Sequence, residues 1–171
     1  MFKEIFIFEI KYRLKRPATW AYFGILLVFG LITAIGGNGP ASEKVFVNSP
    51  IAIARMLSMI SIFGIMLSSA IMGVPIYRDI EHKTEDYYFT YPITEKGYLL
   101  GRFFGSMAVL LLVSLGLHIG LILGFAIGPY AGYVEADRFT DFHLWWYIQP
   151  TFTLYWTNFF FAGCIFFALV G

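Results

Sequence analysis

The chain has 171 residues, of which 58% are hydrophobic and only 13% are charged. Its longest apolar stretches exceed what a strand or a core helix needs, since about 20 helical residues already cross the ~30 Å hydrocarbon layer of a membrane. The composition therefore predicts an integral membrane protein and excludes an ordinary soluble domain. The formal net charge of +1 says little by itself, and we expect no nucleic-acid partner.

The first element in chain order is the basic segment of residues 1–17, which ends at Pro17. Residues 8–15 alternate apolar and polar side chains, which is the period of a β-strand. Basic and apolar residues directly before a span instead suit an interfacial helix, and Pro17 would separate such a helix from the span because proline lacks a backbone donor. We favour the helix, although a segment that only sets topology would fit the charges equally well.

Four apolar stretches follow, at about residues 18–36, 51–76, 103–128 and 148–171. Within the hydrocarbon layer each peptide group must find its partner in the chain, so these stretches are predicted to be transmembrane α-helices. The charged segment before the first span is long and contains acids, which favours a retained anchor over a cleaved signal peptide. The last stretch stops inside an apolar run, and we expect the chain to be truncated, the N-terminal part of a longer protein.

Basic residues are distributed unequally around these spans. Five lie before the first span and four lie between the second and third, whereas the other two loops contain one each, Lys44 and Arg138. The positive-inside rule places the more basic side in the cytoplasm. We therefore expect a multi-pass protein of a cell membrane, the bacterial cytoplasmic membrane, with a cytoplasmic N-terminus and a cytoplasmic loop at 77–102.

This cytoplasmic loop contains the most charged stretch of the chain, YRDIEHKTEDYYFTYPIT. Apolar and aromatic residues recur at helical spacing from Ile76 to Tyr91, which predicts a short amphipathic helix that Pro92 ends. Thr94 is a suitable N-cap for the helix that follows. A topology signal needs only basic residues, so an acid-rich helix favours a docking surface for a soluble partner.

The loop also resembles that of the permease subunits of type-2 ABC transporters, the exporter class. In that family the loop has the pattern R-E-x-E-x-G-T-x-E, then P-I/V-S/T, and then G-K/R at the start of the third span. The matching positions in this chain are Arg78, Asp79, Glu81, Thr84, Asp86, Pro92, Ile93, Thr94, Gly101 and Arg102. Lys83 and Glu85 depart from the family, which usually has glycine at the first position and often leucine at the second.

The resemblance implies that residues 1–171 are the N-terminal part of a single transmembrane permease domain, with two further spans after it. It also implies that the loop at 77–102 couples the spans to a separate ABC ATPase subunit, which would bind ATP and Mg. The implied ATPase-coupling residues are Arg78, Asp79, Glu81, Thr84, Asp86 and Pro92. A second permease half, identical or different, would complete the pathway, and the substrate stays open.

The alternative is a polytopic membrane scaffold or anchor that transports nothing and whose acidic helix recruits another cytoplasmic partner. In either case we expect no enzyme site in this chain. The sequence has no phosphate-binding G-x-x-x-x-G-K-S/T and no H-E-x-x-H motif, so no catalytic, cofactor-binding or metal-ligating residues are predicted.

The third span contains glycine at every fourth residue, at Gly116, Gly120, Gly124 and Gly128. Small residues at this spacing let two helix backbones approach closely. We expect the stripe to pack against another span of the same chain, with a contact between two permease halves as the alternative.

Two polar residues lie within the predicted spans, His118 in the third and Asn158 in the fourth. Polar side chains are costly in the bilayer and often mark a functional site, so these two are the candidate intramembrane polar site. A hydrogen bond to a neighbouring helix is the alternative for each.

Overall fold

The computed structural model describes residues 2–37, 45–81 and 94–170, and these form a bundle of helices. The helices are α1 Phe2–Leu14, α2 Pro17–Ile35, α3 Pro50–Met72, α4 Val74–Glu81, α6 Glu95–Ala131, α7 Trp145–Pro150 and α8 Trp156–Val170. A short 3-10 turn, η1 at Ala136–Arg138, precedes α7, and a π-helical turn, η2 at Thr151–Tyr155, joins α7 to α8. The helix favoured for the N-terminal segment is thus confirmed over the strand.

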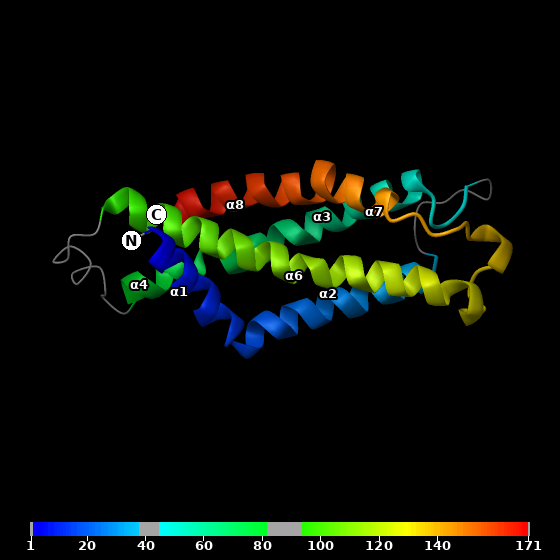
Figure 1. Ribbon diagram of the computed structural model, residues 1–171, viewed down its shortest axis with the longest axis horizontal. Coiled ribbons are helices and arrows are strands. Elements are labelled where there is room, and N and C mark those ends of the chain that lie inside the picture. Colours follow the sequence, from blue (N-terminus) through cyan, green and yellow to red (C-terminus); the bar gives the residue numbers. More distant parts are fainter. Residues whose placement is uncertain (1, 38–44, 82–93, 171) are drawn as a thin grey trace.

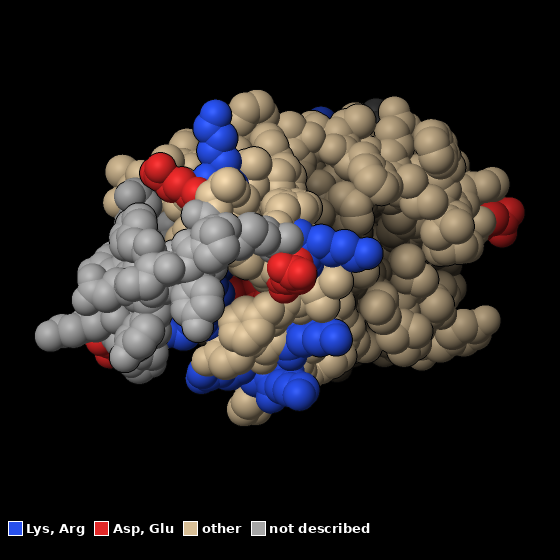
Figure 2. Space-filling view, turned by 60° about the vertical axis from the view of Figure 1, so that its left-hand side comes forward, with Lys and Arg blue, Asp and Glu red and all other residues tan. Residues whose placement is uncertain are grey.

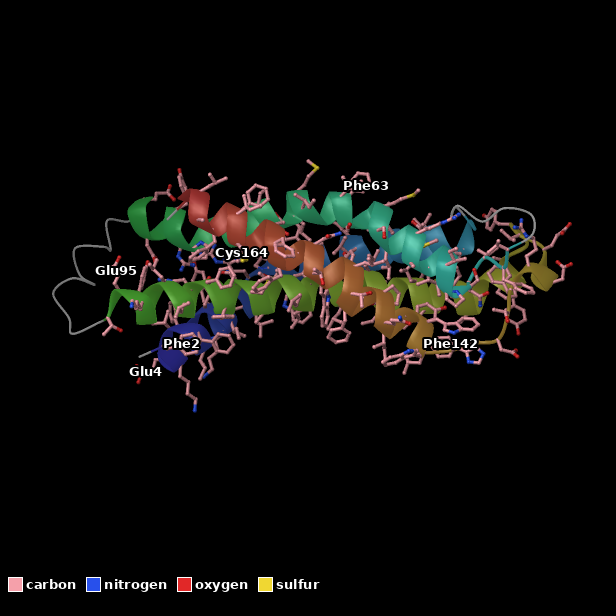
Figure 3. All side chains as sticks on the ribbon, turned by 90° about the horizontal axis from the view of Figure 1, so that it is seen from above. Phe2, Glu4, Phe63, Glu95, Phe142 and Cys164 are labelled. Carbon is pink, nitrogen blue, oxygen red and sulfur yellow. The ribbon has the colours of Figure 1, made fainter. Side chains whose placement is uncertain are left out.

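Four helical stretches are long and apolar enough to cross a membrane, and they match the four predicted spans. They are Pro17–Ile35, Pro50–Asp79, Glu95–Ala131 and Trp145–Leu169. Large apolar side chains point outward from them, as expected where lipid replaces water. Phe63, for example, is 64% exposed and projects away from the bundle in Figure 3.

The longest helix, α6, organises the others. Figure 1 shows α6 running the length of the molecule, with α2 and α8 on either side of it. Its 37 residues span roughly 55 Å at about 1.5 Å each, which exceeds the hydrocarbon layer. The helix begins at Glu95, earlier than the predicted start of the span at 103, so its first two turns extend beyond the apolar stretch.

The first two helices meet at a sharp corner where residues of α2 cap the end of α1. Pro17 occupies the first turn of α2, where a missing N–H does no harm. The Thr19 hydroxyl donates to the Arg13 carbonyl at 2.8 Å, and the Trp20 indole donates to the Leu14 carbonyl at 2.9 Å. These bonds satisfy carbonyl groups that the end of a helix leaves open, and they fix the corner.

The apolar core lies where α3, α6 and η2–α8 meet. Leu57 of α3, Leu117 of α6 and Phe159 of α8 are fully buried there. At one end of this core, α1, α4 and the first turns of α6 come together, and the candidate site lies at that end (Figure 1).

Candidate functional site

Six ionisable side chains from α1, α4 and α6 gather at this end of the bundle. We refer to them as the ionic cluster: Glu9, Arg13, Arg78, Asp79, Tyr98 and Arg102. The cluster holds three guanidinium groups and two carboxylates. Because burial of unpaired charge is very costly, such a group persists only where each charge finds a partner.

Glu9 is the centre of the ionic cluster and is 0% exposed. Its Oε1 accepts a hydrogen bond from Arg13 Nε at 2.6 Å, one helical turn along α1. Its Oε2 accepts from Arg102 Nη1 of α6 at 2.5 Å and from Arg78 Nη2 of α4 at 3.4 Å. One carboxylate of α1 therefore contacts cations from all three helices.

Asp79 completes the connection between α4 and α6. Its Oδ2 lies 2.7 Å from Arg102 Nη2 and also accepts a hydrogen bond from the Tyr98 hydroxyl. Arg102 thus uses two nitrogens of one rigid guanidinium to join the carboxylates of Glu9 and Asp79. Such charge-assisted bonds are stronger than neutral ones, and the planar fork of arginine fixes their directions.

The close approach of α1 to α6 depends on two glycines in the first turns of α6. A Cβ added at Gly105 would lie 2.7 Å from the Cβ of Glu9, and one added at Gly101 would lie 2.9 Å from the Cβ of Ile5. Both distances are shorter than carbon atoms tolerate, so α1 can reach this position only because α6 has no side chain there. The same approach brings Glu9 to Arg102.

Arg13 links α1 to the break between α3 and α4. Helix α3 ends at Met72, and Pro75 in the first turn of α4 has no N–H to donate to the carbonyl of Ile71 four residues earlier. Arg13 Nη2 donates to that carbonyl instead, at 2.8 Å. The side chain that pairs with Glu9 therefore also satisfies the backbone group that the proline leaves open.

The electrostatic balance at Glu9 favours its charged form. Burial alone would raise the pKa of this carboxyl, but the hydrogen bonds and positive charges of Arg13 and Arg102 outweigh burial and hold the pKa below its ordinary value of 4.5. Burial lowers the pKa of the Arg13 guanidinium below its ordinary value, and the partner Glu9 opposes that change. Glu9 is therefore an anion at neutral pH.

The structure separates the predicted ATPase-coupling residues. Asp79 is 6% exposed and points into the ionic cluster, so it does not belong to an exposed docking face as the amphipathic pattern suggested. Its partners Tyr98 and Arg102 lie in the part of α6 that precedes the predicted span. Glu81 is exposed, and Arg78 is half-buried beside Glu9. The remaining three, Thr84, Asp86 and Pro92, lie outside the described residues.

The glycine stripe of α6 lies mainly against α2. A Cβ at Gly116 or Gly120 would overlap the backbone of α2, and a Cβ at Gly124 would lie 2.6 Å from the Leu31 carbonyl oxygen. Gly30 of α2 makes the reciprocal approach, 2.5 Å from the Leu117 carbonyl oxygen. The contacts of these residues are within the chain.

Gly128, the last member of the stripe, has a different neighbour. A Cβ there would lie 2.7 Å from the ring of Phe139, which follows η1 in the loop before α7. This glycine therefore makes room for the loop rather than for α2.

The two candidate intramembrane polar residues contact different helices. His118 Nδ1 lies 3.0 Å from the Ser114 carbonyl oxygen, and its ring meets the ring of Tyr155 edge-on with centroids 5.0 Å apart. Asn158 Nδ2 donates to Ser61 Oγ of α3 at 2.9 Å. No contact joins His118 to Asn158 among the described residues. Asn158 bonds a neighbouring helix, as its alternative expected. The hydrogen bond of His118 is instead to its own helix, and its buried Nε2 has no hydrogen-bond partner.

Sequence reasoning missed the ionic cluster as a unit. It counted Arg13, Arg78 and Arg102 as topology signals, matched Arg78, Asp79 and Arg102 to the loop pattern of the permease family, and gave Glu9 and Tyr98 no role. A signal was present, because Glu9 and Arg13 are four residues apart and would pair on a helix. Within the described ranges, no group of three or more His, Cys, Asp or Glu side chains could hold a metal ion.

Comparison with known proteins gives no match: no family model, no curated protein and no solved structure is significantly similar to this chain.

Proposed function

We propose that this chain is a permease subunit of an ATP-driven exporter of the type-2 ABC class. In this proposal a cytoplasmic ATPase subunit binds ATP and Mg, docks on α4 and the residues that follow it, and moves the spans. A second permease half, identical or different, pairs with this one. The membrane is the bacterial cytoplasmic membrane, and the end that holds the ionic cluster faces the cytoplasm.

The observation that supports this proposal best is the attachment of α4 to the rest of the bundle. In α4, Asp79 forms an ion pair with Arg102 of α6, and Arg78 forms one with Glu9 of α1. A docked partner that displaces α4 would therefore also displace α6, which continues through the membrane. Glu81, at the exposed end of α4, is the described acid best placed for such a partner.

The test is a co-purification of the complete membrane protein in mild detergent, with soluble partners identified by mass spectrometry. Glu81→Lys reverses an exposed charge at the end of α4, and Glu95→Lys is the matched control at the exposed start of α6. Asp79 is unsuitable for this test because its reversal would break the ionic cluster. We expect an ATPase with a phosphate-binding loop to accompany the wild-type and Glu95→Lys proteins and to be lost from Glu81→Lys.

Two results would contradict the proposal. If no ATPase accompanies the wild-type protein, the membrane scaffold becomes the better account of the acidic loop. If an ATPase binds equally well to Glu81→Lys and to the wild type, α4 is not its docking element.

A further inference from the structure

A cavity of about 350 Å³ lies beside the ionic cluster, between the α1–α2 corner, the α3–α4 break and α6. Its floor is apolar and buried, formed by Ile71, Val109 and Val113. Its mouth contains the more exposed side chains of Arg16 and Tyr77. The cavity is therefore amphiphilic, with an apolar interior and a basic, aromatic entrance, and its volume suits a small ligand.

Two arginines at this cavity, Arg16 and Arg78, can still donate hydrogen bonds to an anion. Arg16 and Arg78 lie over the ring of Tyr12, at 4.6 and 4.4 Å from its centroid. Among the described residues, Arg16 has no acidic partner, and the buried Nη1 of Arg78 has no hydrogen-bond partner. A buried donor of a charged group that is left unpaired is costly, and an anion in the cavity would remove that cost.

The charge balance points the same way. The three arginines of the ionic cluster face two carboxylates, Glu9 and Asp79, so the cluster retains one positive charge. Arg16 at the mouth adds another, and Glu81, which also lines the cavity, removes one, so a single net positive charge remains. Figure 2 shows Lys and Arg side chains gathered at this end of the molecule, with Asp and Glu side chains among them and a largely uncharged surface beyond.

The position of the cavity indicates what kind of anion it meets. It lies where the apolar helix α2 begins, and its lining includes Tyr22 and Tyr77, which are 37% and 62% exposed. Exposed aromatic rings at the end of a span are typical of the boundary between lipid and water. A ligand that suits this place would carry an anionic group at the level of the arginines and hydrocarbon at the level of the apolar floor.

We propose that this cavity binds the headgroup phosphate of an anionic phospholipid from the leaflet at the basic end of the protein. Arg16 and Arg78 donate to the phosphate, Tyr22 and Tyr77 line the entrance, and the first acyl carbons cover the apolar floor. The bound lipid would join the α1–α2 corner to α4 and so reinforce the ionic cluster. This proposal does not depend on a permease function, since it requires only a membrane.

The experiment uses the full chain, purified in mild detergent, and measures its thermal unfolding midpoint and the lipids retained in native mass spectrometry. Phosphatidylglycerol is titrated against phosphatidylcholine, and a third arm uses inorganic phosphate. Arg16→Gln removes a lining charge outside the ionic cluster, and Lys15→Gln is its matched control, because Lys15 is exposed, adjacent and absent from the lining. Ala70→Trp fills the cavity and leaves every charge in place.

We expect phosphatidylglycerol, but not phosphatidylcholine, to raise the midpoint of the wild type and of Lys15→Gln. Arg16→Gln should bind it about tenfold more weakly, the effect of one lost charge-assisted hydrogen bond, and Ala70→Trp should not retain it. Equal losses in Arg16→Gln and Lys15→Gln would overturn the proposal, because they would indicate attraction to basic charge in general. Equal stabilisation by inorganic phosphate would overturn the lipid assignment in favour of a soluble phosphate.

Discussion

At the scale of single residues, the stability of the ionic cluster depends on Glu9. This carboxylate is fully buried and, within residues 2–37, 45–81 and 94–170, is the only group that contacts Arg13, Arg78 and Arg102 together. Removing its charge would leave three guanidinium groups close to one another with Asp79 as the remaining described anion. Breaking a buried pair in this way is far more costly than the net contribution of the pair suggests, because the partners stay desolvated.

We predict that Glu9→Gln lowers the free energy of unfolding by about 3 kcal/mol. The measurement is thermal or denaturant unfolding of the purified protein in detergent. Glu135→Gln, at an exposed acid in the loop before α7, is the control and should change stability by less than about 0.5 kcal/mol. A Glu9→Gln variant as stable as that control would mean that the cluster contributes nothing.

The same carboxylate predicts a pH dependence. The pKa of Glu9 is lower in the folded protein than its ordinary 4.5, so the folded state binds the proton more weakly than the unfolded state does. Stabilisation by Glu9 is therefore complete above about pH 5 and is lost as the pH falls through the lower, folded-state pKa. Unfolding midpoints measured from neutral to acid pH should fall less steeply in Glu9→Gln than in the wild type. If the unfolding midpoints of the two proteins fell equally steeply with pH, Glu9 would not be the source of this pH dependence.

At the scale of helices, the glycines of α6 set how closely α1 and α2 pack. The stripe from Gly116 to Gly124 admits the backbone of α2, and the pair of Gly101 and Gly105 admits α1. Close backbone contact gives many weak dispersion contacts over a long interface, which is how helices associate without a hydrophobic driving force in lipid.

We predict that Gly120→Ala destabilises the protein by about 1–3 kcal/mol, because its Cβ would overlap the Leu27 carbonyl group and α2 would have to move. Gly24→Ala on α2 is the matched control, since a Cβ there meets nothing within 4 Å. That control should be neutral or slightly stabilising, as alanine favours helix more than glycine does. Equal effects of the two substitutions on the unfolding midpoint would show that close packing is unimportant.

The helices themselves could be predicted because their signal is local. Length and hydropathy located the four long apolar helices to within a few residues, except at the start of the third, and the basic segment before Pro17 is a helix as favoured. The start of the third span was set at 103 because Lys96 and Arg102 do not look like part of a span, whereas Thr94, the predicted N-cap, does directly precede α6. Lys96 and Arg102 belong to turns that extend beyond the apolar stretch, where charge is tolerated if it is paired.

The ionic cluster could not be predicted in the same way because its partners are distant in the chain. Glu9 and Arg102 are 93 positions apart, and Glu9 and Arg78 are 69 apart. Only the fold brings them together, through the glycine contacts of α1 on α6 and the break before α4. A sequence pattern could assign Asp79 to a polar face but could not show that this one side chain is buried against Arg102.

At the scale of the whole molecule, the cluster joins three segments that are separate in sequence into one unit at the basic end. The segments are α1, α4 and the first turns of α6, and α6 connects them to the opposite end of the bundle. A docked partner that moves α4 can act on the spans only if these segments move together. The central claim is therefore that α1, α4 and the start of α6 open cooperatively rather than one by one.

Hydrogen–deuterium exchange of the purified protein, read by mass spectrometry in the wild type and in Glu9→Gln, tests this claim most directly. Cooperative units exchange together when their shared contacts are removed. We predict that Glu9→Gln raises exchange in α1, in Val74–Glu81 and in residues 95–105 alike, while the far half of α6 stays protected. Faster exchange confined to α1, with α4 unchanged, would contradict the account.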